Sequence, residues 1–434
     1  MLSALIGRIN NRTATVGVIG LGYVGLPLVI RFAEEGFKVI GFDVDSSKVE
    51  KLKKGVSYIK HIPAEKIRSI LKNFTPTSDM KRLEEPDAVI ICVPTPLDHH
   101  LQPDVSYLEK TARDIATTLR KNQLICVEST TYPGTTREIF LSLFEQQTKL
   151  VVGRDYFLVF SPEREDPANP NFETRTIPKL VGGITANCRK AGTALYGAII
   201  IRVIPVSSPE IAESSKLLEN IYRAVNIALV NELKLLFDRM GINVWEVIAA
   251  AATKPFGYQP FYPGPGLGGH CIPVDPFYLT WKAREYDFHT RFIELAGEIN
   301  TSMPYYVAEK TIAALNQRGK AIHNAKILLV GLAYKKNVDD IRESPSFAVL
   351  KILLSRGAKV EYHDPYVPTV EHTRQFPKPV FSVKFTPAVL KKFDAAVIIT
   401  DHDCVDYNLL AKTVPLVIDT RNVYKRTRKN VVKA

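Results

Sequence analysis

ATVGVIGLGYVGLPLVIRFAEEGFKVIGFD, residues 14–43, decides the fold class of this chain. Residues 14–19 form an apolar run typical of a buried strand, and the glycine turn GLGYVG follows at once. Residues 26–35 have the pattern of a helix that ends at Gly36, and residues 38–43 form a second expected strand that ends in a carboxylate. Strand, tight turn, helix and strand make one unit of a parallel sheet.

The same turn predicts a dinucleotide site. The first glycine allows a tight turn, the second lets the backbone approach a pyrophosphate, and the third lets helix and sheet pack closely. The helix N-terminus then faces the phosphates. A carboxylate at the end of the next strand binds the adenosine ribose hydroxyls and repels a 2′-phosphate, so we expect NAD rather than NADP. The expected cofactor residues of this turn are Gly20, Gly22, Tyr23, Val24, Gly25 and Asp43.

Two further parts of the chain alternate between strands and helices, and a mainly helical stretch separates them. Further strands are expected at 87–93, 123–128, 157–161 and 201–206, and a long helix from Pro209 to Met240 is expected to end at Gly241. The alternation restarts with strands at 327–332, 359–363, 395–400 and 416–419 and a helix at 344–355. Its first turn, GLAYK at 331–335, lacks the three glycines, so it predicts a Rossmann relative that does not bind a dinucleotide in the same way.

This pattern predicts an α/β protein with two Rossmann-like, doubly wound parallel sheets joined by helices. We divide it into an NAD-binding domain at 1–205, a helical central domain at 206–310 and a second Rossmann-like domain at 311–434. The apolar residues of the long central helix cover more than one face. We therefore expect it to be buried on several sides, with a second subunit contributing, as in a homodimer or a larger homo-oligomer.

Composition limits the class of protein. Five cysteines without regular spacing argue against a disulfide framework and predict a reducing, cytoplasmic compartment. No Cys/His cluster suggests zinc, so no metal is expected. The start of the chain has no secretory-signal pattern, and no run of 18 apolar residues suggests a membrane span.

The net charge of +12 has three readings: nucleic acid, an anionic small substrate, or solubility alone. No helix-turn-helix, zinc-finger or aromatic RNA-binding pattern accompanies the charge, so we expect no nucleic-acid partner. Charge by itself does not separate the other two readings.

A cysteine in the glycine-rich segment PGPGLGGHCIPVD, residues 263–275, is the expected nucleophile. Small residues such as Gly268 let a substrate approach Cys271 closely, and nearby cations or amides would raise its thiolate fraction. A buried, inert thiol is the alternative, and it is our expectation for Cys92, Cys126 and Cys188. A nicotinamide site plus a nucleophilic thiol suggests two hydride transfers, from alcohol to aldehyde and then from thiohemiacetal to thioester.

Polar residues elsewhere could assist the thiol. Lys216 and Asn220 stand four residues apart on the long helix, where a lysine can stabilise an oxyanion and an asparagine can hold a hydroxyl or a water. Asp275 and Glu163 are the candidate bases for the hydrolytic water. Spacing alone equally fits a solvated lysine, a surface asparagine and ordinary loop acids.

Taken together, these segments resemble the UDP-glucose/GDP-mannose dehydrogenase family. The matching pieces run through all three expected domains in the family's order, and include CVPTP at 92–96, ESTTYPG at 128–134 and the segment from Lys335 to Ser344. The resemblance implies NAD as cofactor and a UDP-sugar as substrate. It assigns catalytic roles to Cys271, Lys216, Asn220, Asp275, Glu163 and Thr131, cofactor contacts to Pro94, Thr95, Thr131 and Arg342, and a substrate contact to Lys335.

Within the family, SPEREDPANP at 161–170 is similar to the members that oxidise UDP-N-acetylglucosamine at C6 for surface polysaccharides. The acetamido group at C2 is larger than a hydroxyl, and Arg164 and the stretch at 173–175 are our candidates for the residues beside it. The third domain and residues 254–262 should hold the UDP end, with Lys254 near phosphate. The full expected substrate set is Glu163, Arg164, Lys216, Asn220, Lys254, Tyr262, Gly268 and Lys335.

The expected reaction is the four-electron oxidation of C6 of UDP-N-acetylglucosamine to the uronic acid. The N-acetylmannosamine and N-acetylgalactosamine epimers and UDP-glucose stay open as substrates. A simple two-electron dehydrogenase and a non-catalytic nucleotide-binding regulator are the further alternatives.

Overall fold

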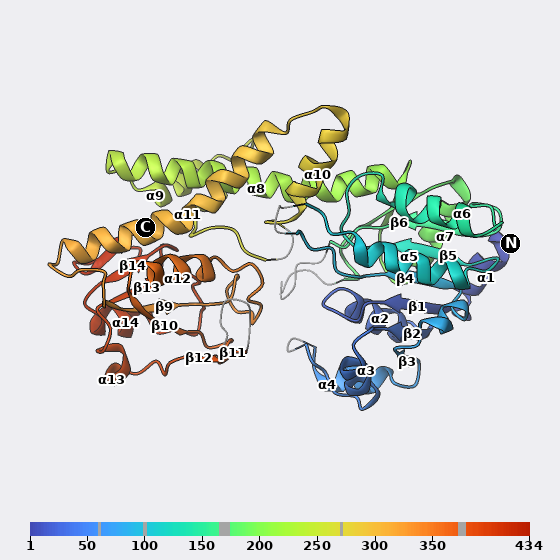
Figure 1. Cartoon of the computed structure of the whole chain (residues 1–434), viewed down its shortest axis with the longest axis horizontal. Coiled ribbons are helices and arrows are strands. Elements are labelled where there is room, and N and C mark those ends of the chain that lie inside the picture. The colour runs from blue at the N-terminus through green and yellow to red at the C-terminus, as the bar shows by residue number, and fades with distance from the viewer. Residues whose placement is uncertain (60–61, 99–101, 165–173, 270–271, 372–378) are drawn as a thin grey trace. The chain divides into compact units, whose positions relative to one another are not determined.

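The computed structural model describes residues 1–59, 62–98, 102–164, 174–269, 272–371 and 379–434 (Figure 1). This part of the chain forms two compact units. The first comprises Met1–Glu219 with Phe277–Phe288, and the second comprises Asn220–Pro276 with His289–Ala434.

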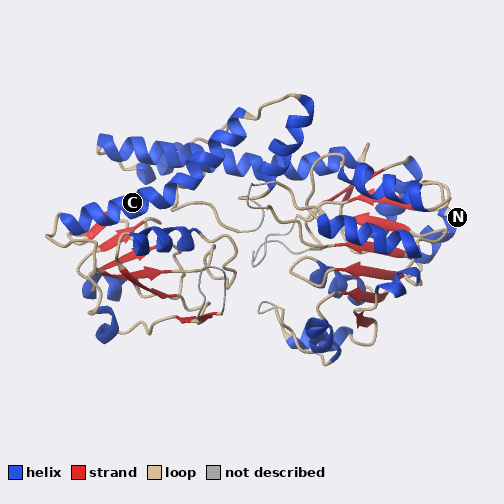
Figure 2. Ribbon diagram, in the orientation of Figure 1, coloured by secondary structure: helices blue, strands red, loops and turns tan. Residues whose placement is uncertain are grey.

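An eight-stranded sheet forms the centre of the first unit, in the order β3-β2-β1-β4-β5-β6-β7-β8. Its strands lie one above another in the blue and green part of Figure 1, and helices lie along them in Figure 2. The strands are β1 (Thr15–Ile19), β2 (Lys38–Phe42), β3 (Phe74–Thr77), β4 (Ala88–Ile91), β5 (Leu124–Val127), β6 (Phe157–Phe160), β7 (Lys179–Gly183) and β8 (Val203–Val206).

Helices connect these strands. They are α1 (Leu2–Asn10), α2 (Gly25–Glu34), α3 (Ser46–Lys53), α4 (Ala64–Ile70), α5 (Ser106–Thr118), α6 (Ser142–Gln147) and α7 (Ala186–Gly197), with a 3₁₀ turn η1 (Met80–Glu84) and a π-helical segment η2 (Thr136–Leu141).

Apolar side chains bury both faces of this sheet. Val16 and Val18 of β1 belong to one core cluster, whereas Ile19 belongs to the other. Successive residues of a strand point to opposite faces, so a strand covered on both sides must be apolar throughout. This requirement explains why residues 14–19 are apolar or glycine at every position except the half-buried Thr15, and it confirms the expected doubly wound class.

The sheet departs from the expected parallel pattern at one pair. Strand β7 runs antiparallel to β6, whereas β7 and β8 are parallel and joined by α7. An antiparallel neighbour needs no helical crossover, so the alternation of strand and helix did not predict this strand. Strand β3 was also missed, because Pro76 interrupts its pattern; proline is tolerated there because β3 is an edge strand.

Long helices follow the first sheet. They are α8 (Pro209–Met240), α9 (Val244–Ala251), α10 (Asp275–Ala283), the short η3 (Arg284–Tyr286) and α11 (Arg291–Asn316). The expected limits of α8 are confirmed: Pro209 is its first residue, and Gly241 after it has a φ of 71°, the left-handed conformation that commonly ends a helix.

The second unit contains a five-stranded sheet in the order β10-β9-β13-β14-β15, all parallel. Ile327 and Leu329 of β9 face one core cluster, and Leu328 and Val330 face the other. The elements are β9 (Lys326–Val330), α12 (Pro345–Ser355), β10 (Lys359–His363), α13 (Pro387–Leu390), β13 (Ala395–Ile398), α14 (Tyr407–Thr413), β14 (Val417–Asp419) and β15 (Val431–Lys433), with a hairpin of β11 (Thr369–Val370) and β12 (Val380–Phe381).

No helix in the described ranges combines the length and the apolar character that crossing a membrane requires.

Candidate active site

The three glycines of the β1–α2 turn have different environments. Gly20 has a φ of 90°, and a Cβ atom on it would lie 2.5 Å from the carbonyl oxygen of Cys92. A Cβ atom on Gly25 would lie 1.9 Å from the carbonyl oxygen of Gly20. A Cβ atom on Gly22 would meet nothing within 4 Å. Packing therefore requires the first and third glycines, while the second leaves open space above the backbone for a ligand to approach.

Asp43 follows β2 and lies beside this turn. Its carboxylate accepts hydrogen bonds from the backbone N–H groups of Leu21 (3.0 Å) and Asp45 (2.9 Å), and Lys48 Nζ lies 3.5 Å away. A carboxylate has about four acceptor positions, so capacity for ribose hydroxyls is left. Among the described contacts, no side chain caps the N-terminus of α2. These observations fit a dinucleotide, whose pyrophosphate would meet the open helix terminus and whose ribose would meet Asp43.

Two further expected cofactor residues lie at the ends of neighbouring strands. Thr131 is buried, and its Oγ1 has no hydrogen-bond partner within the described part of the molecule. Buried hydroxyls are normally satisfied, so this one is suited to a ligand. Thr95 is buried as well, and its carbonyl oxygen accepts a hydrogen bond of 2.9 Å from Tyr278 Oη, which holds the 94–96 segment.

Glu163 belongs to a cluster of buried charges in the first unit. Lys179 Nζ lies 2.7 Å from one oxygen of Glu128 and 3.4 Å from one oxygen of Glu163, and Tyr196 Oη donates to the other oxygen of Glu128. Burial raises the pKa of Glu128, although Lys179 opposes the rise. Burial lowers the pKa of Lys179, but the two carboxylates more than compensate and hold it above its ordinary value. Lys179 therefore stays charged and holds Glu163 in place.

Asn220 and Asp275 form a buried pair in the second unit. The Asn220 side-chain amide donates to the Asp275 carboxylate, and Arg223 donates to the amide oxygen. Both members of the pair are almost fully inaccessible. Lys216, one turn before Asn220 on α8, is buried too, which removes the alternative of a solvated lysine and a surface asparagine. The expected nucleophile, Cys271, lies outside the described residues.

The glycine run before Cys271 packs against the loop 331–344. A Cβ atom on Gly268 would lie 2.7 Å from Tyr334 Cβ, and one on Gly269 would lie 2.8 Å from the Tyr334 ring. The N–H of Gly269 donates to the carbonyl oxygen of Arg342 at 3.1 Å. Only residues without a side chain fit against this loop, which gives the glycines a structural reason beside the expected access for substrate.

The remaining predicted residues have varied surroundings. Lys335 lies half-buried in the same loop, and the Arg342 guanidinium pairs with Asp340. The Arg164 guanidinium pairs with Glu219 at 2.6 Å. Lys254 and Tyr262 are exposed. Their contacts with cofactor or substrate stay predictions.

The half-buried Arg421 and the buried Glu213 are among the polar groups that escaped the sequence analysis. Arg421 lies under the glycine-rich segment, where a Cβ on Gly264 would meet its Nη1 at 2.6 Å; burial lowers the pKa of its guanidinium. Glu213 of α8 accepts hydrogen bonds from the N–H groups of Gly134 and Thr136, and burial raises its pKa to about 7. Their partners are distant in sequence, so no local pattern could have revealed them.

Comparison with known proteins identifies a family whose models match this chain. Three models of the UDP-glucose/GDP-mannose dehydrogenase family match the chain: the NAD binding domain at residues 14–200, the central domain at 210–302 and the UDP binding domain at 328–426.

Relatives that differ in named substrate are similarly close. The chain is 35% identical to the UDP-N-acetyl-D-glucosamine 6-dehydrogenase of Pseudomonas aeruginosa, over 81% of this chain and 83% of that protein. The solved UDP-D-ManNAc dehydrogenase of Pyrococcus horikoshii has a TM-score of 0.87 at 32% identity, covering 96% of this chain and 98% of that one. The NDP-N-acetyl-D-galactosaminuronic acid dehydrogenase of Methanosarcina mazei has a TM-score of 0.80 at 30% identity, covering 100% and 97%.

The family models cover most of the chain, and the described turn fits the NAD that the first of them names. The chain therefore belongs to the UDP-glucose/GDP-mannose dehydrogenase family, and it is an NAD-dependent UDP-sugar dehydrogenase.

Proposed function

We propose that the protein oxidises C6 of UDP-N-acetylglucosamine from alcohol to carboxylate, through a thioester on Cys271. The observation that carries the proposal is the buried hydrogen bond between Asn220 and Asp275, the latter four residues after Cys271 in the chain. A carboxylate and an amide that are both buried and hydrogen-bonded to each other supply a base and a hydroxyl-binding group at a fixed distance. The similarity to UDP-N-acetyl-D-glucosamine 6-dehydrogenases supports the choice of sugar.

The proposed reaction uses these side chains in order. When bound, NAD takes up the hydride that leaves C6, and a second NAD takes up the second hydride. Asp275 or a bound water accepts the proton of the C6 hydroxyl as the aldehyde forms. The Cys271 thiolate adds to that aldehyde, and Lys216 with Asn220 stabilises the resulting oxyanion.

Loss of the second hydride converts the Cys271 adduct into a thioester. Water activated by Asp275 or Glu163 then cleaves the thioester and returns the free thiol. The balance is two NAD and one water consumed for each carboxylate formed. Lys179 supports the second candidate base, because its Nζ lies 3.4 Å from a Glu163 oxygen and 2.7 Å from a Glu128 oxygen and holds the two carboxylates in place.

The NADH yield per mole of sugar tests this proposal. We would supply limiting UDP-N-acetylglucosamine, its manno and galacto epimers, and UDP-glucose in parallel with excess NAD. Two NADH from the gluco N-acetyl sugar, and little from the others, is the expected result. Two NADH from another sugar would move the specificity, and one NADH would restore the simple dehydrogenase.

Substitution of the nucleophile tests the thioester. Cys271→Ser should stop steady-state production of acid, whereas Cys188→Ser, a matched change at a buried cysteine on α7, should leave turnover unchanged. Undiminished NADH production by Cys271→Ser would exclude the thiol role.

We also propose a homodimer built on α8. Leu218 (67% exposed), Leu229 (52%), Leu236 (49%) and Met240 (58%) share one face of this helix, and an apolar face of that size favours a second copy of the chain. Sedimentation should find a dimer that Leu229→Glu with Leu236→Glu dissociates. A stable, active monomer of the unsubstituted protein would contradict it.

The free thiols of Cys92, Cys126, Cys188 and Cys404 support a reducing compartment, and we place the reaction in the cytoplasm. Its product, a UDP-linked N-acetylated uronic acid, would supply surface polysaccharide synthesis.

A further inference from the structure

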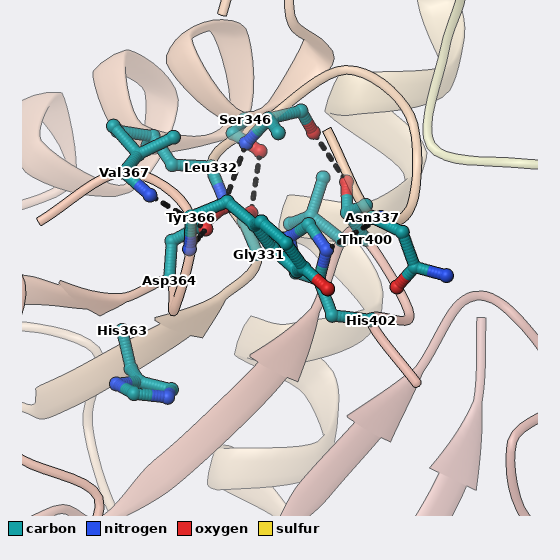
Figure 3. A network of polar contacts seen from close by, with 12 residues as sticks. Gly331, Leu332, Asn337, Ser346, His363, Asp364, Tyr366, Val367, Thr400 and His402 are labelled. Atoms are coloured by element: carbon teal, nitrogen blue, oxygen red, sulfur yellow. Dashed lines mark hydrogen bonds and ion pairs between the residues drawn. The ribbon is translucent and has the colours of Figure 1, made fainter. Parts of the chain in front are cut away.

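A buried histidine–aspartate pair holds the first part of the loop 331–344 in the second unit. His402 and Asp364 are both inaccessible to solvent, and His402 Nε2 lies 3.0 Å from Asp364 Oδ2. The backbone N–H of Asn337 donates to His402 Nδ1 at 2.9 Å. A ring nitrogen that accepts carries no proton, so the imidazole is the neutral tautomer that donates from Nε2 to Asp364 (Figure 3).

Asp364 fixes the start of the loop from the same side. Its Oδ2 accepts hydrogen bonds from the N–H groups of Leu332 (2.6 Å) and Ala333 (2.9 Å). Thr400 Oγ1 donates to the carbonyl oxygen of Ala333 at 2.5 Å. The backbone on the N-terminal side of Lys335 therefore has no freedom to shift.

The backbone on the other side of Lys335 is fixed by His402 and its neighbour Asp403. Asn337 has a φ of 62°, in the left-handed region that asparagine adopts more readily than most other non-glycine residues. Its N–H is held by His402, and its side chain exchanges two hydrogen bonds with Asp403, one at 2.6 Å and one at 3.1 Å. Lys335 thus lies in a short arch whose backbone is anchored on both sides.

The far end of the loop reaches the glycine run. Arg342 accepts from the N–H of Gly269, and the Tyr334 ring occupies the space that a side chain on Gly269 would need. Gly269 stands two residues before Cys271 in the chain. One loop therefore both presents Lys335 and supports the segment that leads to the proposed nucleophile.

From this arrangement we propose that His402 is a positioning residue for the UDP-sugar. It holds the loop 331–344, and with it Lys335 and the Gly268–Gly269 support, in the conformation that binds substrate. It touches neither substrate nor cofactor in this role. The inference deepens the proposed function and rests on it for the identity of the substrate.

Two substitutions separate the two hydrogen bonds of His402. The amide oxygen of His402→Asn can replace Nδ1 as the acceptor for Asn337, whereas the amide of His402→Gln reaches only toward Asp364. We expect His402→Gln to raise the KM for the UDP-sugar and the Kd for UDP by about tenfold, because the Asn337 N–H loses its buried partner. His402→Asn should change both by no more than about threefold, and the KM for NAD should not move in either variant.

His363→Asn is the matched control. His363 is the neighbouring residue of Asp364, and its Nδ1 lies 2.8 Å from the carbonyl oxygen of Val383 and 3.5 Å from Ser382 Oγ. Any loss of stability that this variant causes in the same sheet should leave the KM for the UDP-sugar unchanged.

Equal KM values for His402→Gln and the unsubstituted protein, with lower thermal stability alone, would reduce His402 to a structural role and overturn the inference. If His402→Gln does not fold, Asp403→Ala removes the exposed half of the anchor and should raise the KM by about threefold; no change there would overturn it too. The NADH yield of the unsubstituted protein is independent of these ratios, so a yield of one would reject the thioester and leave the His402 result standing.

Discussion

Gly20 and Gly331 occupy the same place in the two sheets. Each directly follows the first strand of its sheet, with φ values of 90° and 88°. A Cβ atom on Gly20 would lie 2.5 Å from the carbonyl oxygen of Cys92, and one on Gly331 would lie 2.4 Å from that of Thr400. In both sheets the glycine lets the turn pass close to the end of the neighbouring strand. This first glycine therefore belongs to the fold rather than to the cofactor.

The two turns differ after that glycine. Helix α2 begins at Gly25, five residues on, without a side-chain cap in the described contacts, whereas α12 begins at Pro345 and is capped by Ser344. Ser346 Oγ donates a hydrogen bond of 2.9 Å to the carbonyl oxygen of Gly331. A capped helix has fewer N–H groups to offer a phosphate, so only the first turn is open to one.

The aspartates that follow β2 and β10 also differ in how many hydrogen bonds they accept within the protein. Asp43 accepts from two backbone N–H groups. Asp364 accepts from the N–H groups of Leu332, Ala333, Tyr366 and Val367, and also from His402 (Figure 3). A carboxylate whose acceptor positions are all used inside the protein cannot bind a ribose. The contacts of Asp43 and Asp364 therefore indicate that cofactor binding depends on which polar groups a common fold leaves unsatisfied.

The largest expected effect is on Asp364. Asp364→Ala leaves several buried N–H groups and His402 without a partner, so we expect it to destabilise the second unit by about 3–5 kcal/mol. Asp43→Ala should reduce stability by no more than about 2 kcal/mol. Denaturant unfolding measures the free energy of unfolding of both variants. Equal losses would mean that the two carboxylates contribute equally to stability, contrary to the difference in their contacts.

The stability of the second unit at low pH should also depend on the Asp364 carboxylate. Burial raises the pKa of Asp364, but the hydrogen bonds that it accepts from His402 and from the N–H groups of Ala333 and Leu332 together lower it below its ordinary value. A depressed pKa contributes stability that is complete above about pH 4 and is lost as the pH falls through the folded value. The second unit should therefore lose stability below about pH 4, and Asp364→Ala should remove that part of the loss.

Next in size are the two matched glycines. Gly20→Ala and Gly331→Ala each force a Cβ atom into a backbone carbonyl at positive φ, and we expect each to lose about 2–4 kcal/mol of stability. Gly22→Ala, which meets open space, is the control and should leave stability unchanged while weakening NAD binding. Thermal unfolding with and without NAD distinguishes the three. Weak NAD binding with full stability in Gly20→Ala would mean that the first glycine also serves the cofactor.

A smaller effect is expected on cofactor choice. Asp43→Ala removes the carboxylate that we expect to bind the ribose, so the Kd for NAD should rise about tenfold and the preference for NAD over NADP should fall. Fluorescence titration with both cofactors measures the ratio. Asp43→Asn is a useful companion, because it keeps the size and removes the charge. An unchanged ratio in both variants would show that the ribose lies elsewhere.

The smallest effect is expected at Ser346. Ser346→Ala removes one hydrogen bond to the Gly331 carbonyl and should lower stability by about 1 kcal/mol, with no change in the KM for NAD. The corresponding change in the first turn, Gly25→Ala, places a Cβ atom 1.9 Å from a carbonyl oxygen and should abolish NAD binding. Similar effects of the two substitutions would mean that the turns are more alike than their contacts indicate.

Much of the molecule could be predicted from local pattern. The strands at 15–19 and 38–42, the glycine turn between them and the acid after them are all close in sequence, and α8 ends where its glycine requires. Strands β3 and β7 were missed for physical reasons, since a proline at an edge and an antiparallel return both depart from the pattern of a buried parallel strand.

The sequence by itself determined the fold class and the NAD turn, because a helix, a strand or a tight turn depends on residues within a few positions of one another. Only the tertiary structure decided which polar groups meet. It joined Asn220 to Asp275 across 55 positions and Asp364 to His402 across 38, and it buried Lys216, for which spacing alone favoured solvent. Burial and pairing are properties of the packed molecule, since a polar side chain takes its partner from whatever element the fold brings beside it.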